Sequence, residues 1–230
     1  MARQTSLRLV NRDAIARSRE SRRFVDEILA ELAARQFAPS AWTTFIARSL
    51  VRSVAQVRER PNAAAEITAL HLLAVVRGGR RWALVSWFLC VTHLGLLGDR
   101  TTLGWSNRLT LLRALLPSVG PDSPWTALIA LATDLVDGHL ARRKHESAFG
   151  AYADPIADGI FWSWYALRWE PSRWGRWVPI TLFGGSVAVI AIAYFARART
   201  IDYPRPMAVR YASGITQIVL ALRALRAVAR

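Results

Sequence analysis

Residues 134–158 read DLVDGHLARRKHESAFGAYADPIAD, and four aspartates frame this stretch. Asp134 and Asp137 are three residues apart, and Asp154 and Asp158 are four apart. If both flanks are helical, each pair projects from one helix face, because residues at these spacings are neighbours on a helix. Two helices joined by a short basic loop would then direct four carboxylates into one space. Such charges repel strongly in a low-dielectric setting, and the simplest compensation is one or two divalent cations.

The whole chain combines an apolar composition with a strongly basic one. Of its 230 residues 53% are hydrophobic, yet the formal net charge is +15 and the pI is about 11.5. A basic chain suits nucleic acid or an anionic membrane surface. The apolar half and the ten tryptophans favour the membrane, because Trp is enriched at the bilayer interface. We therefore expect a membrane partner and no nucleic acid.

Residues 1–80 are rich in arginine and predict a basic amphipathic helical region. Apolar residues recur at helical spacing over 12–36 and again over 40–58. A third helix is expected from Pro61 to near Gly78. These helices form either a small soluble bundle or a bundle that lies on the cytoplasmic leaflet through its arginines.

Residues 81–230 predict a membrane-embedded domain. Its apolar runs cover 82–98, 107–119, 125–140, 148–169, 177–196 and 207–222. Only 148–169 and 177–196 reach the roughly 20 residues that span a bilayer. The shorter runs 107–119 and 125–140 would need a tilted hairpin or a locally thinned bilayer. The expected fold class is all-α, an integral membrane bundle of about five to six membrane helices behind the amphipathic N-terminal region.

The acidic residues of 134–158 suit a hard cation. Carboxylates are ligands for Mg2+ or Mn2+, and no Cys or His cluster suggests zinc. Arg142 suits a phosphate, because its planar guanidinium binds two oxygens at once. The residues together indicate a metal–diphosphate site. The alternative is a buried ion-pair network with Arg142, Arg143 and Lys144 as partners, which is disfavoured because ionisable residues at membrane depth are costly and usually functional.

The stretch resembles the signature of the CDP-alcohol phosphatidyltransferases, D-x2-D-G-x2-A-R-x8-G-x3-D-x3-D. The matching positions are Asp134, Asp137, Gly138, Ala141, Arg142, Gly150, Asp154 and Asp158. One departure is a shorter loop, with seven residues rather than eight between Arg142 and Gly150. This departure bears on the placement of those two residues and leaves the aspartate pairs unaffected.

A second resemblance lies upstream, at Asn107-x-x-Thr110-x-x-Arg113. It is similar to the N-x-x-T-x-x-R that opens the first helix of the family, and at this spacing the three residues share one helix face. In the family that face contributes to the nucleotide site. The resemblance covers about residues 104–222 and leaves residues 1–80 outside.

The resemblance implies an integral membrane transferase of phospholipid biosynthesis. The family moves a substituted phosphate from a CDP-linked lipid, such as CDP-diacylglycerol, to the hydroxyl of an acceptor alcohol and releases CMP. By that analogy Asp158 is the general base on the acceptor hydroxyl. The analogy gives two ions of Mg2+ or Mn2+ the ligands Asp134, Asp137, Asp154 and Asp158. It gives the nucleotide the contacts Asn107, Thr110, Arg113, Gly138, Ala141, Arg142 and Gly150.

The acceptor alcohol is the least determined partner. Arg205 and Arg210 are candidate contacts, because family members that use phosphorylated polyols place basic residues near the acceptor. The same arginines would equally serve as positive-inside anchors at a helix end. Glycerol 3-phosphate, inositol phosphate and other acceptors therefore stay open, and a homodimer is compatible with the resemblance.

The resemblance also implies a location in the plasma (inner) membrane, with the active site facing the cytoplasm. The run 107–119 then crosses outward and 125–140 crosses inward. If 82–98 also crossed, the basic residues 1–80 would lie outside, against the positive-inside tendency. We therefore expect 82–98 to be an interfacial helix, and the alternative, a span directed inward, restores a count of six helices.

A function of a different class is a catalytically silent membrane scaffold. Residues 1–80 would then bind anionic lipid or protein partners through their arginines. The shorter loop, the short apolar runs and the large N-terminal region motivate this alternative. The four aspartates argue against it, because a scaffold has no reason to keep unpaired acids.

Overall fold

The computed structural model describes residues 20–144, 147–201 and 207–228, and within these ranges every regular element is a helix. For residues 137–144 and 228 it describes the backbone alone. Residues 20–34 form a first helix. The others are α2 (Pro39–Glu59), α3 (Pro61–Val76), α4 (Arg80–Thr92), the 3-10 turn η1 (Leu94–Leu97), α5 (Gly104–Val119), α6 (Thr126–Lys144), α7 (Ala148–Trp169), α8 (Arg173–Arg197) and α9 (Met207–Val228). The all-α class is confirmed for this part of the chain.

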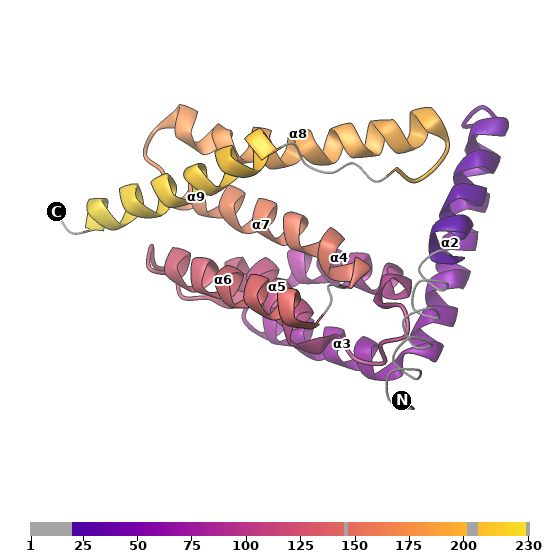
Figure 1. Ribbon diagram of the computed structural model, residues 1–230, viewed down its shortest axis with the longest axis horizontal. Coiled ribbons are helices and arrows are strands. Elements are labelled where there is room, and N and C mark those ends of the chain that lie inside the picture. The colour runs from indigo at the N-terminus through magenta and orange to yellow at the C-terminus, as the bar shows by residue number, and fades with distance from the viewer. Residues whose placement is uncertain (1–19, 145–146, 202–206, 229–230) are drawn as a thin grey trace, which may run out of the picture.

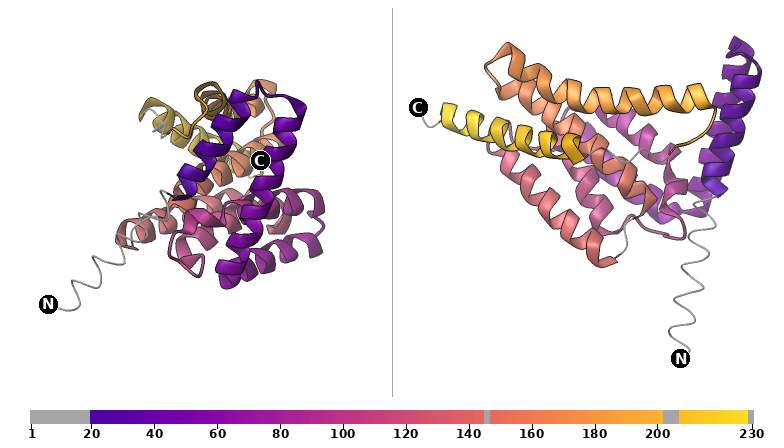
Figure 2. Two further views of the ribbon diagram at one scale, coloured as in Figure 1. Left: turned by 90° about the vertical axis from the view of Figure 1, so that its right-hand side faces the viewer. Right: turned by 45° about the horizontal axis from the view of Figure 1, so that its top comes forward.

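The helices have two orientations. In Figure 1, α3 to α9 run along the long axis of the molecule, and α2 stands across them at one end. Figure 2 (right) shows the same arrangement from a tilted direction. The helix 20–34 pairs with α2 through an Arg48–Glu31 ion pair of 2.5 Å. Phe37 and Trp42 meet Phe195 at the end of α8, with ring centroids 6.5 and 5.7 Å away.

Helix boundaries agree with the apolar runs to within a few residues, with two informative differences. The run 82–98 divides into α4 and η1. Helix α6 continues to Lys144, so Arg142 and Arg143, expected in a basic loop, belong to its last turn. The expected helix over 12–36 is described only from residue 20, because residues 1–19 lie outside the described ranges.

Hydropathy singles out one helix. Among the described residues only α8 is long and apolar enough to cross a bilayer by itself. The expected span 148–169 has the required length as α7, but it carries Asp154 and Asp158 and packs its aromatic side chains inside the protein. The expected count of five to six membrane helices is therefore not confirmed by length and hydropathy.

Helix α7 lies at the centre of the bundle and contacts α5, η1, α8 and α9. The core of the bundle contains three aromatic side chains of α7, each at most 1% exposed: Phe161, Trp162 and Tyr165. Trp162 is therefore a core residue, and not one of the tryptophans that could lie at a bilayer interface. Its indole packs edge to face on Phe161, with ring centroids 5.0 Å apart. Trp174 and Trp177, at the start of α8, are exposed, as an interfacial position requires.

The far end of α7 is tied to the turn between α5 and α6. The Tyr165 hydroxyl donates a 2.8 Å hydrogen bond to the Pro124 carbonyl. Arg168 donates to both carboxylate oxygens of Asp122, at 3.1 and 2.8 Å. These hydrogen bonds lower the pKa of Asp122, so the turn carries a charged carboxylate at neutral pH. The three helices that carry the candidate site are thus joined at the end remote from it.

A close approach of α7 and α8 at Gly159 gives the first testable prediction. A Cβ added there would lie 2.9 Å from the Cβ of Phe183, whereas a Cβ on Gly184 of α8 would meet nothing within 4 Å. Overpacking of this kind costs about 1–3 kcal/mol, more than the roughly 1 kcal/mol that alanine gains over glycine in a helix. We expect Gly159→Ala to lower the midpoint of heat-induced loss of the monodisperse peak in detergent.

Gly184→Ala is the matched control, because it makes the same chemical change in a helix without the contact. It should leave the midpoint unchanged or raise it slightly. Equal midpoints for the two variants would contradict the packing of α7 against α8.

Candidate metal and nucleotide site

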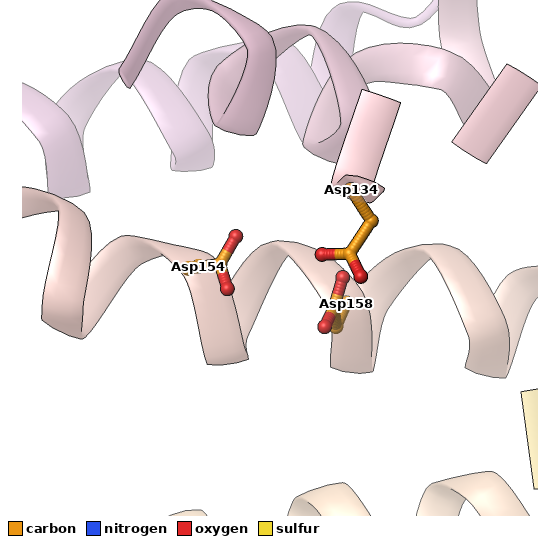
Figure 3. A group of neighbouring side chains, drawn as sticks. All are labelled: Asp134, Asp154 and Asp158. Atoms are coloured by element: carbon orange, nitrogen blue, oxygen red, sulfur yellow. The ribbon is translucent and has the colours of Figure 1, made fainter. Parts of the chain in front are cut away.

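Three aspartates from two helices converge on one point. Asp134 comes from α6, and Asp154 and Asp158 come from successive turns of α7, as Figure 3 shows. One carboxylate oxygen of each lies within 4.8 Å of the others. The spacing of four residues places Asp154 and Asp158 on the same face of α7, as the sequence predicts. Asp137 lies one turn further along the backbone of α6, and its side chain is outside the described set.

A buried arginine from a third helix joins the three carboxylates. The side chain of Arg113 on α5 is 0% exposed. Its guanidinium lies 3.1 Å from Asp134 Oδ1 and 2.8 Å from Asp158 Oδ1, and it also forms an ion pair with Asp154. An ion-pair network with Arg142, Arg143 and Lys144 was the alternative expected from the sequence, and the side chains of these three residues lie outside the described set. Within the described set the cation of the network is Arg113.

Among the side chains that the structure describes, negative charges outnumber positive ones in this cluster. Asp134, Asp154 and Asp158 face one guanidinium, so these four described side chains carry a net charge of −2. The Asp158 side chain is 14% exposed, whereas those of Asp134 and Asp154 are 43% and 36% exposed. The deep side of the cluster is therefore neutralised by Arg113, and the residual negative charge faces the more open side. This is where a cation or a cation-bound ligand can approach.

The start of α7 is fixed against α5 by polar contacts beside the cluster. The Asn107 amide donates to the Leu103 carbonyl at 2.7 Å and to Ser147 Oγ at 3.0 Å. Ser147 caps α7, because its Oγ accepts the Gly150 backbone N–H at 3.1 Å. A Cβ on Gly150 would lie 2.7 Å from Asn107 Oδ1, so this glycine permits the close approach.

Ser147 is a residue that the motif does not contain. The signal that could have found it is a serine directly before a helical run, which is typical of an N-cap. Its role is to set where α7 begins, and hence where Asp154 and Asp158 lie along the helix.

The predicted nucleotide contacts have different surroundings. Asn107, Thr110 and Arg113 lie on one face of α5 and are each at most 1% exposed. Gly138, Ala141 and Arg142 belong to the last turns of α6, and nothing of their side chains is described. Their role as nucleotide contacts stays a prediction. Of the candidate acceptor residues, Arg205 lies outside the described residues, and Arg210 is exposed on α9.

The donor set fits a hard divalent cation. Oxygen ligands about 2.1 Å from Mg2+ in octahedral geometry lie at most about 4.2 Å from one another. The carboxylate oxygens of Asp134, Asp154 and Asp158 lie within 4.8 Å of one another, so small side-chain rotations suffice to bring them to that distance. The net charge of −2 on the four described side chains equals the charge that one such ion would neutralise.

Comparison with known proteins gives one match. The family model described as CDP-alcohol phosphatidyltransferase matches residues 106–229, which include α6, α7, α8, α9 and nearly all of α5. No curated protein and no solved structure matches the chain. Members of the family are membrane enzymes that depend on a divalent metal and transfer a phosphatidyl group from a CDP-alcohol. Because the match covers more than half of the chain, the protein belongs to the CDP-alcohol phosphatidyltransferase family.

Proposed function

We propose that this protein transfers a substituted phosphate from a CDP-linked lipid, such as CDP-diacylglycerol, to the hydroxyl of an acceptor alcohol and releases CMP. The observation that supports this most strongly is the convergence of Asp134, Asp154 and Asp158 beside Arg113, within the region that the family model matches. Neither a lone acidic cluster nor a family match would specify the reaction as well as the two together.

The ligands proposed for the metal are Asp134, Asp137, Asp154 and Asp158, with Mg2+ or Mn2+ as the ion. A divalent cation, when bound, neutralises the diphosphate and stabilises the charge that develops on departing CMP. Arg113 of α5 holds Asp134 against the two aspartates of α7, so α6 and α7 present their carboxylate oxygens in a fixed arrangement. That preorganisation lowers the cost of assembling the site.

Asp158 is proposed as the general base. It is the least exposed of the three aspartates, and Arg113 Nε orients its carboxylate at 2.8 Å. The acceptor oxygen forms a bond to the lipid-bearing phosphorus, the bond from that phosphorus to the CMP oxygen breaks, and the hydroxyl proton passes to Asp158. Gly138, Ala141, Arg142 and Gly150 are proposed on the CDP part. Arg205 and Arg210 are proposed near a phosphorylated acceptor.

The membrane arrangement proposed is a bundle of α5 to α9 with the site end facing the cytoplasm, in a plasma (inner) membrane. Helix α8 supplies one span by length and hydropathy. Further support comes from large apolar side chains that are exposed on α6, α8 and α9, where lipid would cover them. Residues 81–230 would form this domain, and residues 1–80 would precede it as a basic helical region.

The second candidate, a silent membrane scaffold, gains one observation. The three described aspartates are paired with Arg113, so a purely structural ion-pair network is an explanation for keeping them. Among the described side chains of the network, carboxylates outnumber guanidinium groups by two, which a structural role does not require. Enzyme and scaffold therefore differ in whether the cluster responds to a divalent cation.

Loss of the proposed base is the direct test of the reaction. We expect the purified protein to release CMP from CDP-diacylglycerol only with Mg2+ or Mn2+ and a suitable acceptor, and chelation to abolish release. Asp158→Asn should lower turnover by about 100-fold or more, since general bases contribute on the order of 10²–10⁴, while CDP binding persists. Asp122→Asn, an exposed ion-paired aspartate outside the site, should keep normal turnover.

Two results would overturn the proposal. One is normal turnover in Asp158→Asn, which would remove the base assignment. The other is a well-folded wild-type sample that neither binds CDP nor releases CMP with glycerol 3-phosphate, inositol phosphate or any other acceptor in the screen.

Removing the buried cation tests whether the cluster binds metal. Arg113→Gln leaves three carboxylates without their partner, which costs about 3–5 kcal/mol for a buried pair. A divalent cation bound there would offset much of this loss. We expect the variant to have a lower thermal midpoint than wild type in chelator, and a larger rise on addition of Mg2+ or Mn2+.

Arg108→Gln is the control, because Arg108 lies on the same helix and pairs with Glu66 away from the cluster. Its midpoint should respond to the cation as wild type does. A scaffold with a structural ion-pair network predicts no response to the cation in any of the three proteins.

A further inference from the structure

Helices α3 and α4 form a hairpin that follows α5 along its whole length. Near the start of α5, Arg108 forms a 2.8 Å ion pair with Glu66 of α3. At the other end, a Cβ on Gly79 in the turn between α3 and α4 would collide with the side chain of Ser118, in the last turn of α5. The hairpin therefore covers the same depth as the helix that supplies Arg113. It lies outside residues 106–229, which the family model matches.

Polar side chains in the middle of this hairpin are turned inward and are paired. Three hydrogen bonds close them: His71 Nε2 with Ser86 Oγ at 3.0 Å, Trp87 Nε1 with Thr68 Oγ1 at 3.0 Å, and Trp82 Nε1 with the Ala114 carbonyl at 2.9 Å. The first two join α3 to α4, and the third joins α4 to α5. Polar side chains that pair between helices, with no water needed, are typical of helices surrounded by lipid.

The outward face of the hairpin is apolar. Residues 67–76 and 82–98 contain no Asp, Glu, Lys or Arg. Seven large hydrophobic side chains on the two helices are 42% to 82% exposed: Leu72, Leu73, Val76, Leu84, Val85, Phe88 and Leu89. A continuous face of this kind is unfavourable in water and suits hydrocarbon. Its polar-inside, apolar-outside pattern is the reverse of a bundle dissolved in water.

Apart from Glu66, which is paired with Arg108, the charged residues of the hairpin lie at its tip. Arg77, Arg80 and Arg81 flank the turn and are exposed. Arginines at the end of an apolar hairpin suit the phosphates of lipid headgroups, towards which their long side chains extend. Helix α3 has 16 residues, as α5 has, and is thus about 24 Å long. Both are shorter than the roughly 30 Å hydrocarbon core, so the same local thinning or snorkelling serves both.

We infer that α3 and α4 form a membrane-inserted hairpin beside α5, with lipid acyl chains covering its outward face and the three arginines among headgroups of the leaflet opposite α2. The hairpin packs against α5, most of which lies within the region that the membrane enzyme family's model matches. Two crossings return the basic residues 1–60 to the side of the site, which satisfies the positive-inside tendency. The run 82–98 is then neither an interfacial helix nor a single isolated span. It contains the second helix of the hairpin, α4, which crosses back towards the side of the site.

Cysteine accessibility in sealed membranes tests this topology. Cys90 is the sole cysteine and is buried, so Cys90→Ala gives a background without thiols. On it, Arg77→Cys reports the hairpin tip, Ser123→Cys the turn between α5 and α6, and Arg58→Cys the end of α2. We expect a membrane-impermeant maleimide to label Arg77→Cys and Ser123→Cys from one side and Arg58→Cys only from the other.

A second pair of variants tests the lipid cover. Leu72→Cys and Leu84→Cys occupy positions that are 57% and 62% exposed in the protein. We expect less than about a tenth of either thiol to react with the impermeant maleimide from either side, and full reaction after denaturation in SDS. Each variant is compared at equal accumulation in the membrane and equal elution in detergent.

The inference is overturned if Arg77→Cys is labelled from the same side as Arg58→Cys. It is also overturned if Leu72→Cys and Leu84→Cys react in intact membranes as readily as Arg58→Cys, which is the result for a water-exposed bundle. Both outcomes are independent of catalysis, so failure of the proposed reaction leaves this test intact.

Discussion

The ion pairs of a single buried guanidinium organise the functional half of this molecule. Arg113 of α5 contacts aspartates on both α6 and α7, so one side chain joins the three helices that meet at the site. A buried arginine without partners would be very costly, and three converging carboxylates without a cation would be equally so. Each side therefore requires the other, and the packing of α5 against α6 and α7 follows from this mutual need. Among the described side chains, carboxylates outnumber guanidinium groups, and this excess of negative charge is what the proposed metal site would use.

Much of this region could be predicted from residue spacing. Aspartates at intervals of three and four specify a helix face, and the face of Asn107, Thr110 and Arg113 follows from the same rule. The partner of Arg113 could not be predicted, because periodicity tells which way a side chain points and not which distant helix it meets. Arginines 142 and 143 lie closer in sequence to the aspartates, and local proximity made them the natural candidates for an ion-pair network.

The role of the apolar helices in the N-terminal half does not follow from their sequence, for a different reason. An apolar helix of 16 residues satisfies the rules for a core helix and fails those for a membrane span, so composition alone does not decide between them. The two kinds of helix differ in whether their polar side chains point towards the neighbouring helix, as His71 does towards Ser86. This direction is known only when α3 and α4 are seen packed together. Helix α3 also contacts α4 and α5 across the domain boundary that was expected at residue 80. These contacts likewise follow from the tertiary structure and not from the sequence alone.

The tethering of α7 at both ends has a consequence for how a lipid substrate is reached. Ser147 and Asn107 fix one end of the helix, and Tyr165 and Arg168 fix the other. Helix α7 is therefore held at both ends, and the ten residue steps from Asp158 to Arg168 correspond to about 15 Å along the helix. For the lipid donor proposed above, this length of α7 would set the depth at which the diphosphate lies.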